Sequence, residues 1–319
     1  MVIGRMYNYV SMMRLDHWHK NLFVVPGILA AWKYFEMDLG DFGVYIPAIL
    51  AFLIACLASS VNYIVNELLD AKFDKFHPVK KDRPAAKGDI RPLFAVLLAF
   101  GLLTIVLILS LHFLPKAFTY TLIAFWISGL IYNVPPLRAK DIAFLDTVVE
   151  SVNNPIRLAL GWFCYTPNVL PPSSAMMAYW CLAGFMMTAK RFAEYSVFDD
   201  NHSRINYRKS FGVYTRARLI NFICFWISLF SLMFGIFVVR VNTNTILVFP
   251  FIAVFFAWYM KLAFEKDSVV RDPERMFKRP IFFLYSLSVF VALIAILFLG
   301  ERITIMDWVQ NNASFIILP

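Results

Sequence analysis

Long apolar stretches, separated by short charged segments, constrain the fold of this chain most. A helix needs about 20 mostly apolar residues to cross the hydrocarbon core of a bilayer. The sequence predicts nine such helices, over residues 18–35, 44–69, 92–113, 117–134, 142–163, 174–190, 219–239, 245–263 and 280–299. Since 60% of the residues are hydrophobic and only 16% are charged, we expect an all-α membrane protein that forms one integral-membrane domain over residues 1–319.

Positive charge is distributed unevenly between the connecting segments. Most of the 30 Lys and Arg residues lie in the N-terminal segment and in four stretches, 66–91, 137–140, 190–218 and 261–279. Because positively charged loops remain in the cytoplasm, we expect the N-terminus and these loops to be cytoplasmic. The expected location is a bacterial inner membrane. Nine spans would place the C-terminus outside. The net charge of +9 then reflects topology and anionic lipids rather than binding of nucleic acid.

Motifs of several common enzyme classes are missing from the sequence. There is no Walker A, G-x-G-x-x-G, H-E-x-x-H or G-x-S-x-G pattern, so the usual nucleotide-binding folds, zinc proteases and serine hydrolases are excluded. The N-terminus has no apolar core followed by small residues, and we therefore expect no cleaved signal peptide.

A polar stripe interrupts the second predicted span. Asn62, Asn66, Asp70 and Asp74 recur every four residues, and a helix places such residues on one face. Mg²⁺ prefers oxygen ligands and binds through one or two carboxylates plus substrate phosphates. We therefore predict a Mg²⁺ site with Asn66, Glu67, Asp70 and Asp74 as ligands, in which the two aspartates are catalytic. A solvated helix end with pairs four residues apart is the structural alternative.

Basic residues follow this stripe at once. His77, Lys80 and Arg83 are candidates for neutralising phosphate charge that a metal leaves uncovered. We therefore expect the substrate to carry a diphosphate.

A second charged cluster follows the sixth span. It contains Lys190, Arg191 and Glu194, for which we predict two phosphate contacts and a third catalytic, metal-binding carboxylate. An intrahelical pair between Lys190 and Glu194 explains the pattern equally well. Because the clusters follow the second and sixth spans, we expect two four-helix halves plus a ninth helix, with the two clusters facing each other.

A third polar line runs through the fifth span. Asp146, Glu150, Asn154 and Arg157 recur at helical spacing, and an arginine inside a span usually faces the bundle interior. Arg157 is therefore a candidate substrate-binding residue, although a network closed between Glu150 and Arg157 is the alternative. Further candidates for substrate binding are Lys20 and Asn21 at the start of the first span, Asn62 in the polar stripe, and Arg138 and Lys140 in the turn before the fifth span.

Three stretches resemble motifs of the UbiA superfamily of intramembrane prenyltransferases. Asn66–Asp74 resembles its NDxxDxxxD motif, and Arg14–Asn21, reading RLDHWHKN, is similar to its RPxQWxKN motif. Tyr132–Lys140, reading YNVPPLRAK, resembles its YSxPPxRxK turn. The resemblance spans essentially the whole chain and implies the nine-helix UbiA fold.

Two further stretches look most like the decaprenyl-phosphate phosphoribosyltransferases of that superfamily. They are HPVKKDRPAAKG, from His77 to Gly88, and KRFAE, from Lys190 to Glu194. This resemblance implies Mg²⁺-dependent transfer of 5-phosphoribose from phosphoribosyl diphosphate to a polyprenyl phosphate, a membrane lipid. It also implies two faces of one site, with one built from Asn66, Asp70 and Asp74 and the other from Lys190, Arg191 and Glu194.

Two other functions stay open. The Pro135-Pro136 turn looks closer to branches with aromatic acceptors, and Glu67 stands where the family motif has Asp. Transfer of a prenyl group from prenyl diphosphate to an aromatic acceptor is therefore the alternative. A transporter is less favoured because transporter sites lie near the bilayer midplane, whereas the densest charge here lies at helix ends on one side.

Overall fold

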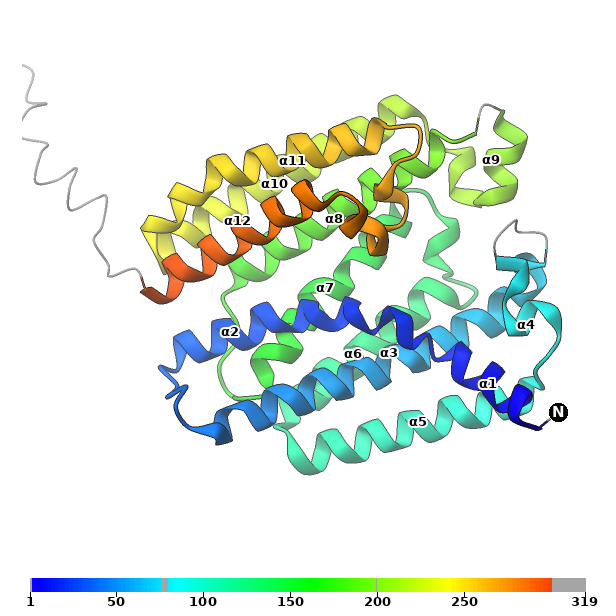
Figure 1. Cartoon of the computed structure of the whole chain (residues 1–319), viewed down its shortest axis with the longest axis horizontal. Coiled ribbons are helices and arrows are strands. Elements are labelled where there is room, and N and C mark those ends of the chain that lie inside the picture. The colour runs from blue at the N-terminus through cyan, green and yellow to red at the C-terminus, as the bar shows by residue number, and fades with distance from the viewer. Residues whose placement is uncertain (1, 76–79, 199, 300–319) are drawn as a thin grey trace, which may run out of the picture. The chain divides into compact units, whose positions relative to one another are not determined.

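The computed structural model describes residues 2–75, 80–198 and 200–299 (Figure 1). Within these ranges the regular structure is helical throughout, without a strand. The α-helices are α1 (Val2–Met12), α2 (Val25–Tyr34), α3 (Tyr45–Asp74), α4 (Pro84–Lys87), α5 (Pro92–Phe113), α6 (Lys116–Asn133), α7 (Leu145–Phe163), α8 (Ser173–Tyr195), α9 (Asn201–Tyr207), α10 (Arg216–Val241), α11 (Phe249–Phe264) and α12 (Pro280–Leu299). Short 3₁₀ helices connect them, namely η1 (Leu15–Val24), η2 (Phe42–Val44), η3 (Lys80–Asp82), η4 (Ala139–Asp141), η5 (Lys209–Gly212), η6 (Thr243–Val248), η7 (Val269–Arg271) and η8 (Pro273–Lys278).

The chain divides into two compact units. Unit 1 comprises residues 1–171 and 205–213, and unit 2 comprises residues 172–204 and 214–319. The division therefore falls after the fifth predicted span rather than after the fourth, because α7 packs on α2 and α6 of unit 1. The expectation of one domain over the whole chain stays a prediction.

Five helical stretches in the described ranges are long and apolar enough to cross a membrane. They are Phe42–Lys72, Pro92–Phe113, Arg216–Val241, Thr243–Phe264 and Pro280–Phe298. The predicted count of nine spans is thus not confirmed. The first predicted span is interrupted, since η1 precedes a ten-residue α2, and α7 carries Asp146, Glu150 and Arg157 along its length.

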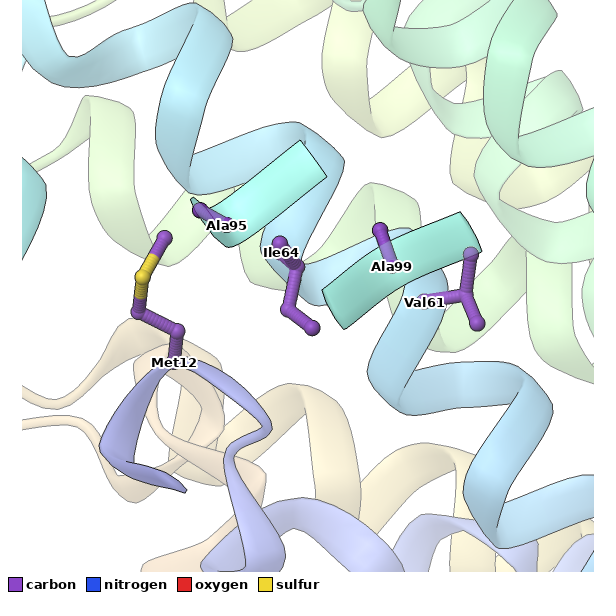
Figure 2. Close-up of a cluster of buried hydrophobic side chains, with 5 residues drawn as sticks. All are labelled: Met12, Val61, Ile64, Ala95 and Ala99. Atoms are coloured by element: carbon purple, nitrogen blue, oxygen red, sulfur yellow. The ribbon is translucent and has the colours of Figure 1, made fainter. Parts of the chain in front are cut away.

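In unit 1, an apolar cluster sets the rotation of α3 about its axis. Val61 and Ile64 of α3 pack with Met12 of α1 and with Ala95 and Ala99 of α5 (Figure 2). The small alanine side chains let α3 and α5 approach closely, as small residues do between membrane helices. With this apolar side buried, the polar residues of α3 point to other neighbours.

Two glycines bring η1 and α2 into backbone contact with α7. A Cβ atom added at Gly161 of α7 would lie 2.1 Å from the carbonyl oxygen of Val24, and one at Gly27 would lie 1.9 Å from that of Leu158. No larger residue fits this contact without a backbone shift. The contact holds the end of η1 against the middle of α7, where Arg157 lies.

Unit 2 is built around α8 and α10. Gly184 of α8 accommodates the indole of Trp226 of α10, which lies 2.5 Å from the position of a Cβ at that glycine. Phe185 of α8 packs edge-on against Phe256 of α11, with ring centres 4.7 Å apart, an arrangement that aromatic pairs favour. These contacts hold the middle of α8, and the second charged cluster lies at the end of the same helix.

Candidate active site

One ammonium group sits among the polar side chains of α3. The Nζ atom of Lys140 lies 2.7 Å from both carboxylate oxygens of Asp70 and 3.0 Å from Oδ1 of Asn66. It also lies 3.1 Å from Oδ1 of Asn133, the last residue of α6. Arg138 donates a further hydrogen bond of 2.8 Å to Asp70. Four oxygen atoms from α3 and α6 therefore surround one cation, and Asp70 is paired with two.

Arg138 and Lys140 lie in the turn of residues 134–144, between α6 and α7. This turn has an unusual backbone. Arg138 has φ 30° and Phe144 has φ 67°, positive values that non-glycine residues rarely adopt. Such conformations cost non-glycine residues about 1–3 kcal/mol each and persist only where the surroundings hold them. Arg138 is held by its bond to Asp70 and by bonds to Asp141 at 3.1 Å and to the carbonyl of Asn133 at 3.3 Å.

The cluster around Lys140 is largely excluded from solvent. The exposed fraction of the side chain is 11% for Lys140, 15% for Asp70 and 16% for Arg138. Burial lowers the pKa of Lys140 to about 8, against the opposing effect of the Asp70 carboxylate, because burial disfavours the charged form. Charge interactions in such a place are stronger than in water.

The predicted polar stripe divides between two sides of α3. Asp74 accepts a hydrogen bond of 2.6 Å from Arg83, and Glu67 accepts one of 3.2 Å from the backbone N–H of Ala85 in α4. On an α-helix, residues four apart differ in direction by about 40°, whereas residues seven apart point in nearly the same direction. Asp74 therefore shares a side with Glu67, and Asn66 and Asp70 point to the turn before α7.

Asn62, the first residue of the stripe, packs against α6. A Cβ atom added at Gly129 of α6 would lie 2.6 Å from the side-chain amide of Asn62. The glycine thus leaves room for this amide beside α6.

A cavity of about 540 Å³ opens on the Glu67 side of α3. Its lining comes from α1, η1, α3 and the segment around α4, and consists of Tyr7, Val10, Ser11, Arg14, Leu15, Asp16, Glu67, Asp82, Arg83 and Pro84. Burial and the positive charge of Arg83 lower the pKa of Arg14. Two guanidinium groups and a buried carboxylate therefore meet at this cavity.

Arg157 and Asn21, two separately predicted binding residues, contact each other. Arg157 donates to Oδ1 of Asn21 at 3.1 Å and to Oδ1 of Asn154 at 3.3 Å. Its guanidinium also lies over the ring of Phe125, 5.0 Å from the centre. Asn21 is fully buried, and the neighbouring Lys20 is half-buried on η1. Glu150, in the same polar line of α7, accepts a bond of 3.0 Å from the Tyr132 hydroxyl.

In unit 2, the second cluster contains a buried ion pair. Arg191 donates to Glu194 at 2.9 Å, and both side chains are buried. Lys190 is half-buried beside them. The pair within this helix therefore joins Glu194 to Arg191, where the sequence suggested a pair with Lys190.

Some predicted residues are not placed, and some contributing residues were not predicted. His77 and the side chain of Lys80 lie outside the described residues. Asn133 and Asp141 were not predicted as site residues, although both contact the cations that hold Asp70. The only signal in the sequence was that Asn133 lies inside the motif-like stretch Tyr132–Lys140 and that Asp141 directly follows it.

The residues around Lys140 suit a divalent cation by their chemistry. No group of three or more His, Cys, Asp or Glu side chains in the described ranges is arranged to hold a metal ion. The four oxygens around the Lys140 ammonium already surround a cation, however, and one carboxylate with amide oxygens is a donor set that Mg²⁺ accepts when substrate phosphates complete it.

The chain is similar in sequence to proteins with named activities. A decaprenyl-phosphate phosphoribosyltransferase of Mycolicibacterium smegmatis is 29% identical over 211 residues, covering 66% of this chain and 63% of that protein. The match thus spans less than two thirds of that relative. A protein of the same name from Mycobacterium tuberculosis is 27% identical over 216 residues, covering 66% of this chain and 67% of that protein.

Solved structures share the fold at low identity. A UbiA homolog from Archaeoglobus fulgidus bound to GPP and Mg²⁺ aligns with a TM-score of 0.65 and 16% identity, over 88% of this chain and 99% of that chain. The same homolog bound to DMAPP and Mg²⁺ aligns with a TM-score of 0.66 and 15% identity, over 88% and 98%. The sequence matches the UbiA prenyltransferase family over residues 23–287. This match covers most of the chain, and the protein therefore belongs to the UbiA prenyltransferase family of integral-membrane transferases.

Proposed function

We propose that this protein transfers 5-phosphoribose from phosphoribosyl diphosphate to a polyprenyl phosphate, with loss of diphosphate. The observation that carries this proposal is the likeness to the mycobacterial phosphoribosyltransferases, each matched over 66% of this chain. The cation-rich surroundings of Asp70 suit a substrate of this charge.

The reaction breaks the bond between C1 of ribose and a diphosphate oxygen. The bonding electron pair leaves with the diphosphate, C1 gains oxocarbenium character, and a phosphate oxygen of the lipid forms the new bond to C1. Arg138 and Lys140 stabilise the charge that develops on the departing diphosphate, since donors held in place before the reaction are worth more in a dry site than in water.

The same residues fit a requirement for Mg²⁺. Asn66 and Asp70 would hold the ion, and we assign Glu67, Asp74 and Glu194 to the same metal and diphosphate site. When bound, Mg²⁺ neutralises diphosphate charge and so favours its departure. The Archaeoglobus fulgidus homolog was solved with Mg²⁺ together with GPP or DMAPP, which supports the requirement for Mg²⁺.

Other basic residues have a role in this proposal. Lys190 and Arg191 contact the diphosphate from the second face, with Glu194 beside them. Phosphoribosyl diphosphate carries an additional 5-phosphate, for which His77, Lys80 and Arg83 are the nearest candidates in the sequence.

We place this site at the cytoplasmic side of a bacterial inner membrane, with the C-terminus outside. The positive charge of the segments around the two acidic clusters supports this orientation. A lipid acceptor then reaches the site from the bilayer, and a water-soluble donor reaches it from the cytoplasm.

A second candidate is prenyl transfer from a prenyl diphosphate to an aromatic acceptor. It is favoured by the fold neighbours, which bind GPP and DMAPP. This reaction has the same leaving group and uses the same cationic residues, but its reacting carbon is allylic.

An assay that offers both donors to the purified protein distinguishes the two functions. We expect a lipid-linked phosphoribose product from phosphoribosyl diphosphate, polyprenyl phosphate and Mg²⁺, and no product from prenyl diphosphate with an aromatic acceptor. The Asp70→Asn variant should lose this product. Asp267→Asn makes the same chemical change at a fully exposed side chain and should retain it. Product from the prenyl donor alone would overturn the proposal.

A further inference from the structure

A segment from far along the chain packs on the turn that carries Lys140. Residues 205–213 belong to unit 1, although α8 and α10 on either side of them belong to unit 2. Within this segment η5 contacts η4, which contains Lys140. Phe211 of η5 is fully buried, and its ring stacks on that of Tyr207. The segment is therefore a packed part of unit 1.

Arg208 of this segment bridges the two ends of the turn. Its Nη2 atom donates a hydrogen bond of 2.9 Å to the hydroxyl of Tyr132, near the end of α6. Its Nε atom lies 3.2 Å from Oδ2 of Asp146, in the first turn of α7. Asp146 is fully buried and also accepts a bond of 3.3 Å from Ser210. One guanidinium thus ties α6 to α7 across the residues between them.

The bridged turn is one that needs such support. It contains two non-glycine residues with positive φ, Arg138 and Phe144, and such residues depend on their surroundings to stay in place. On one side the turn is held by Asp70, through Lys140 and Arg138. Contacts to 205–213 hold the other side, where Lys209 also lies 3.4 Å from Asp141.

We propose that Arg208 is a positioning residue for the transfer reaction. Its contacts with Tyr132 and Asp146 fix the turn, and Arg138 and Lys140 therefore stay at the site of the leaving diphosphate. Arg208 itself acts through these two partners. The part of this inference that concerns the donor rests on the proposed function. The part that concerns the turn does not.

Hydrogen exchange of the purified protein without substrate tests the structural part. In Arg208→Gln, we expect faster amide exchange in residues 134–144 and unchanged exchange in α5. Arg208→Lys keeps the charge beside Asp146 and should show an intermediate rate. Arg216→Gln removes an exposed arginine at the start of α10 and serves as the matched control. Unchanged exchange in 134–144 of Arg208→Gln would overturn the inference.

Steady-state kinetics test the functional part. We expect Arg208→Gln to raise the donor KM about tenfold or more and to lower kcat, because small displacements of positioning groups cost up to about 10²-fold. The acceptor KM should stay unchanged, whereas general damage to the fold would raise both. Tyr132→Phe removes one bond of the bridge and should cause a smaller loss that is not additive with Arg208→Gln.

The outcomes separate this inference from the proposed function. If wild-type protein makes no product from phosphoribosyl diphosphate but Arg208→Gln loosens the turn, the proposed function fails and the positioning role stands. If wild-type protein is active and Arg208→Gln has an unchanged donor KM, the positioning role fails and the proposed function stands.

Discussion

Asp70 and Asp74 lie one turn apart on α3, yet their partners come from very different places. Asp74 pairs with Arg83, only nine residues on. Asp70 pairs with Lys140 and Arg138, 70 and 68 residues on. The first pair needs only the segment that follows α3, whereas the second needs α3, α6 and the turn before α7 to be assembled. Two carboxylates that look equivalent in the sequence thus belong to different kinds of interaction, one local and one tertiary.

The comparison predicts that Asp70→Asn causes the largest loss of activity. Neutralising this carboxylate removes the negative charge with which both cations pair and weakens a proposed metal ligand. We expect kcat to fall about 10³-fold, as for other charge-stabilising groups. Turnover with phosphoribosyl diphosphate should be measured beside Asp267→Asn. Near-normal turnover of Asp70→Asn would remove this residue from the mechanism.

A smaller loss is expected from Lys140. In Lys140→Met, Asp70 keeps its hydrogen bond from Arg138. We therefore expect kcat to fall about 10²-fold. Lys140→Arg keeps the charge but does not fit the four-oxygen surroundings of the ammonium, so it should restore only part of the activity. Full activity of Lys140→Met would show that Asp70 works without this partner.

The local pair should matter more for stability than for turnover. Arg83→Gln leaves the buried Asp74 carboxylate without this partner, and we expect a loss of about 1–3 kcal/mol in the free energy of unfolding with at most about a tenfold change in kcat. Thermal unfolding in detergent and the turnover assay measure the two effects. A kcat loss as large as that of Asp70→Asn would show that the Arg83 side chain itself takes part in turnover and does more than stabilise Asp74.

The smallest effect on activity is expected from a packing change. Gly161→Ala forces a methyl group against the carbonyl of Val24 and should cost about 1–3 kcal/mol, as overpacking does, with only a few-fold loss of kcat through the contact of Arg157 with Asn21. Gly101→Ala has nothing within 4 Å of its new Cβ and is the matched control. Equal unfolding temperatures for both variants would contradict the close contact of η1 with α7.

Part of the site could be predicted from the sequence. The spacing of Asn66 and Asp70 predicted that they share a face, and both contact Lys140. Arg138, Lys140, Arg157 and Asn21 were predicted as binding residues, but their partners were not. Helix geometry alone would have separated Asp74 from Asn62, since a rotation of about 120° accumulates over 12 residues.

Arg208 shows what sequence patterns miss. Nothing in its neighbourhood marks it apart from other basic residues of the 190–218 segment. The only available signal was that Asp146, a carboxylate within a predicted span, needs a partner. Which of the many cations supplies it depends on where residues 205–213 pack.

The sequence alone determined the class of this protein, because long apolar helices and the UbiA-like motifs depend on residues that are near one another in the chain. The tertiary structure decided which charges meet. Hydrogen bonds form only within about 3 Å, and segments some 70 residues apart reach that distance only through helix packing such as the glycine contacts of α2 with α7 and of α3 with α6. The pairing of Asp70 with Lys140 is therefore a product of packing, whereas the pairing of Asp74 with Arg83 needs only the segment that follows α3.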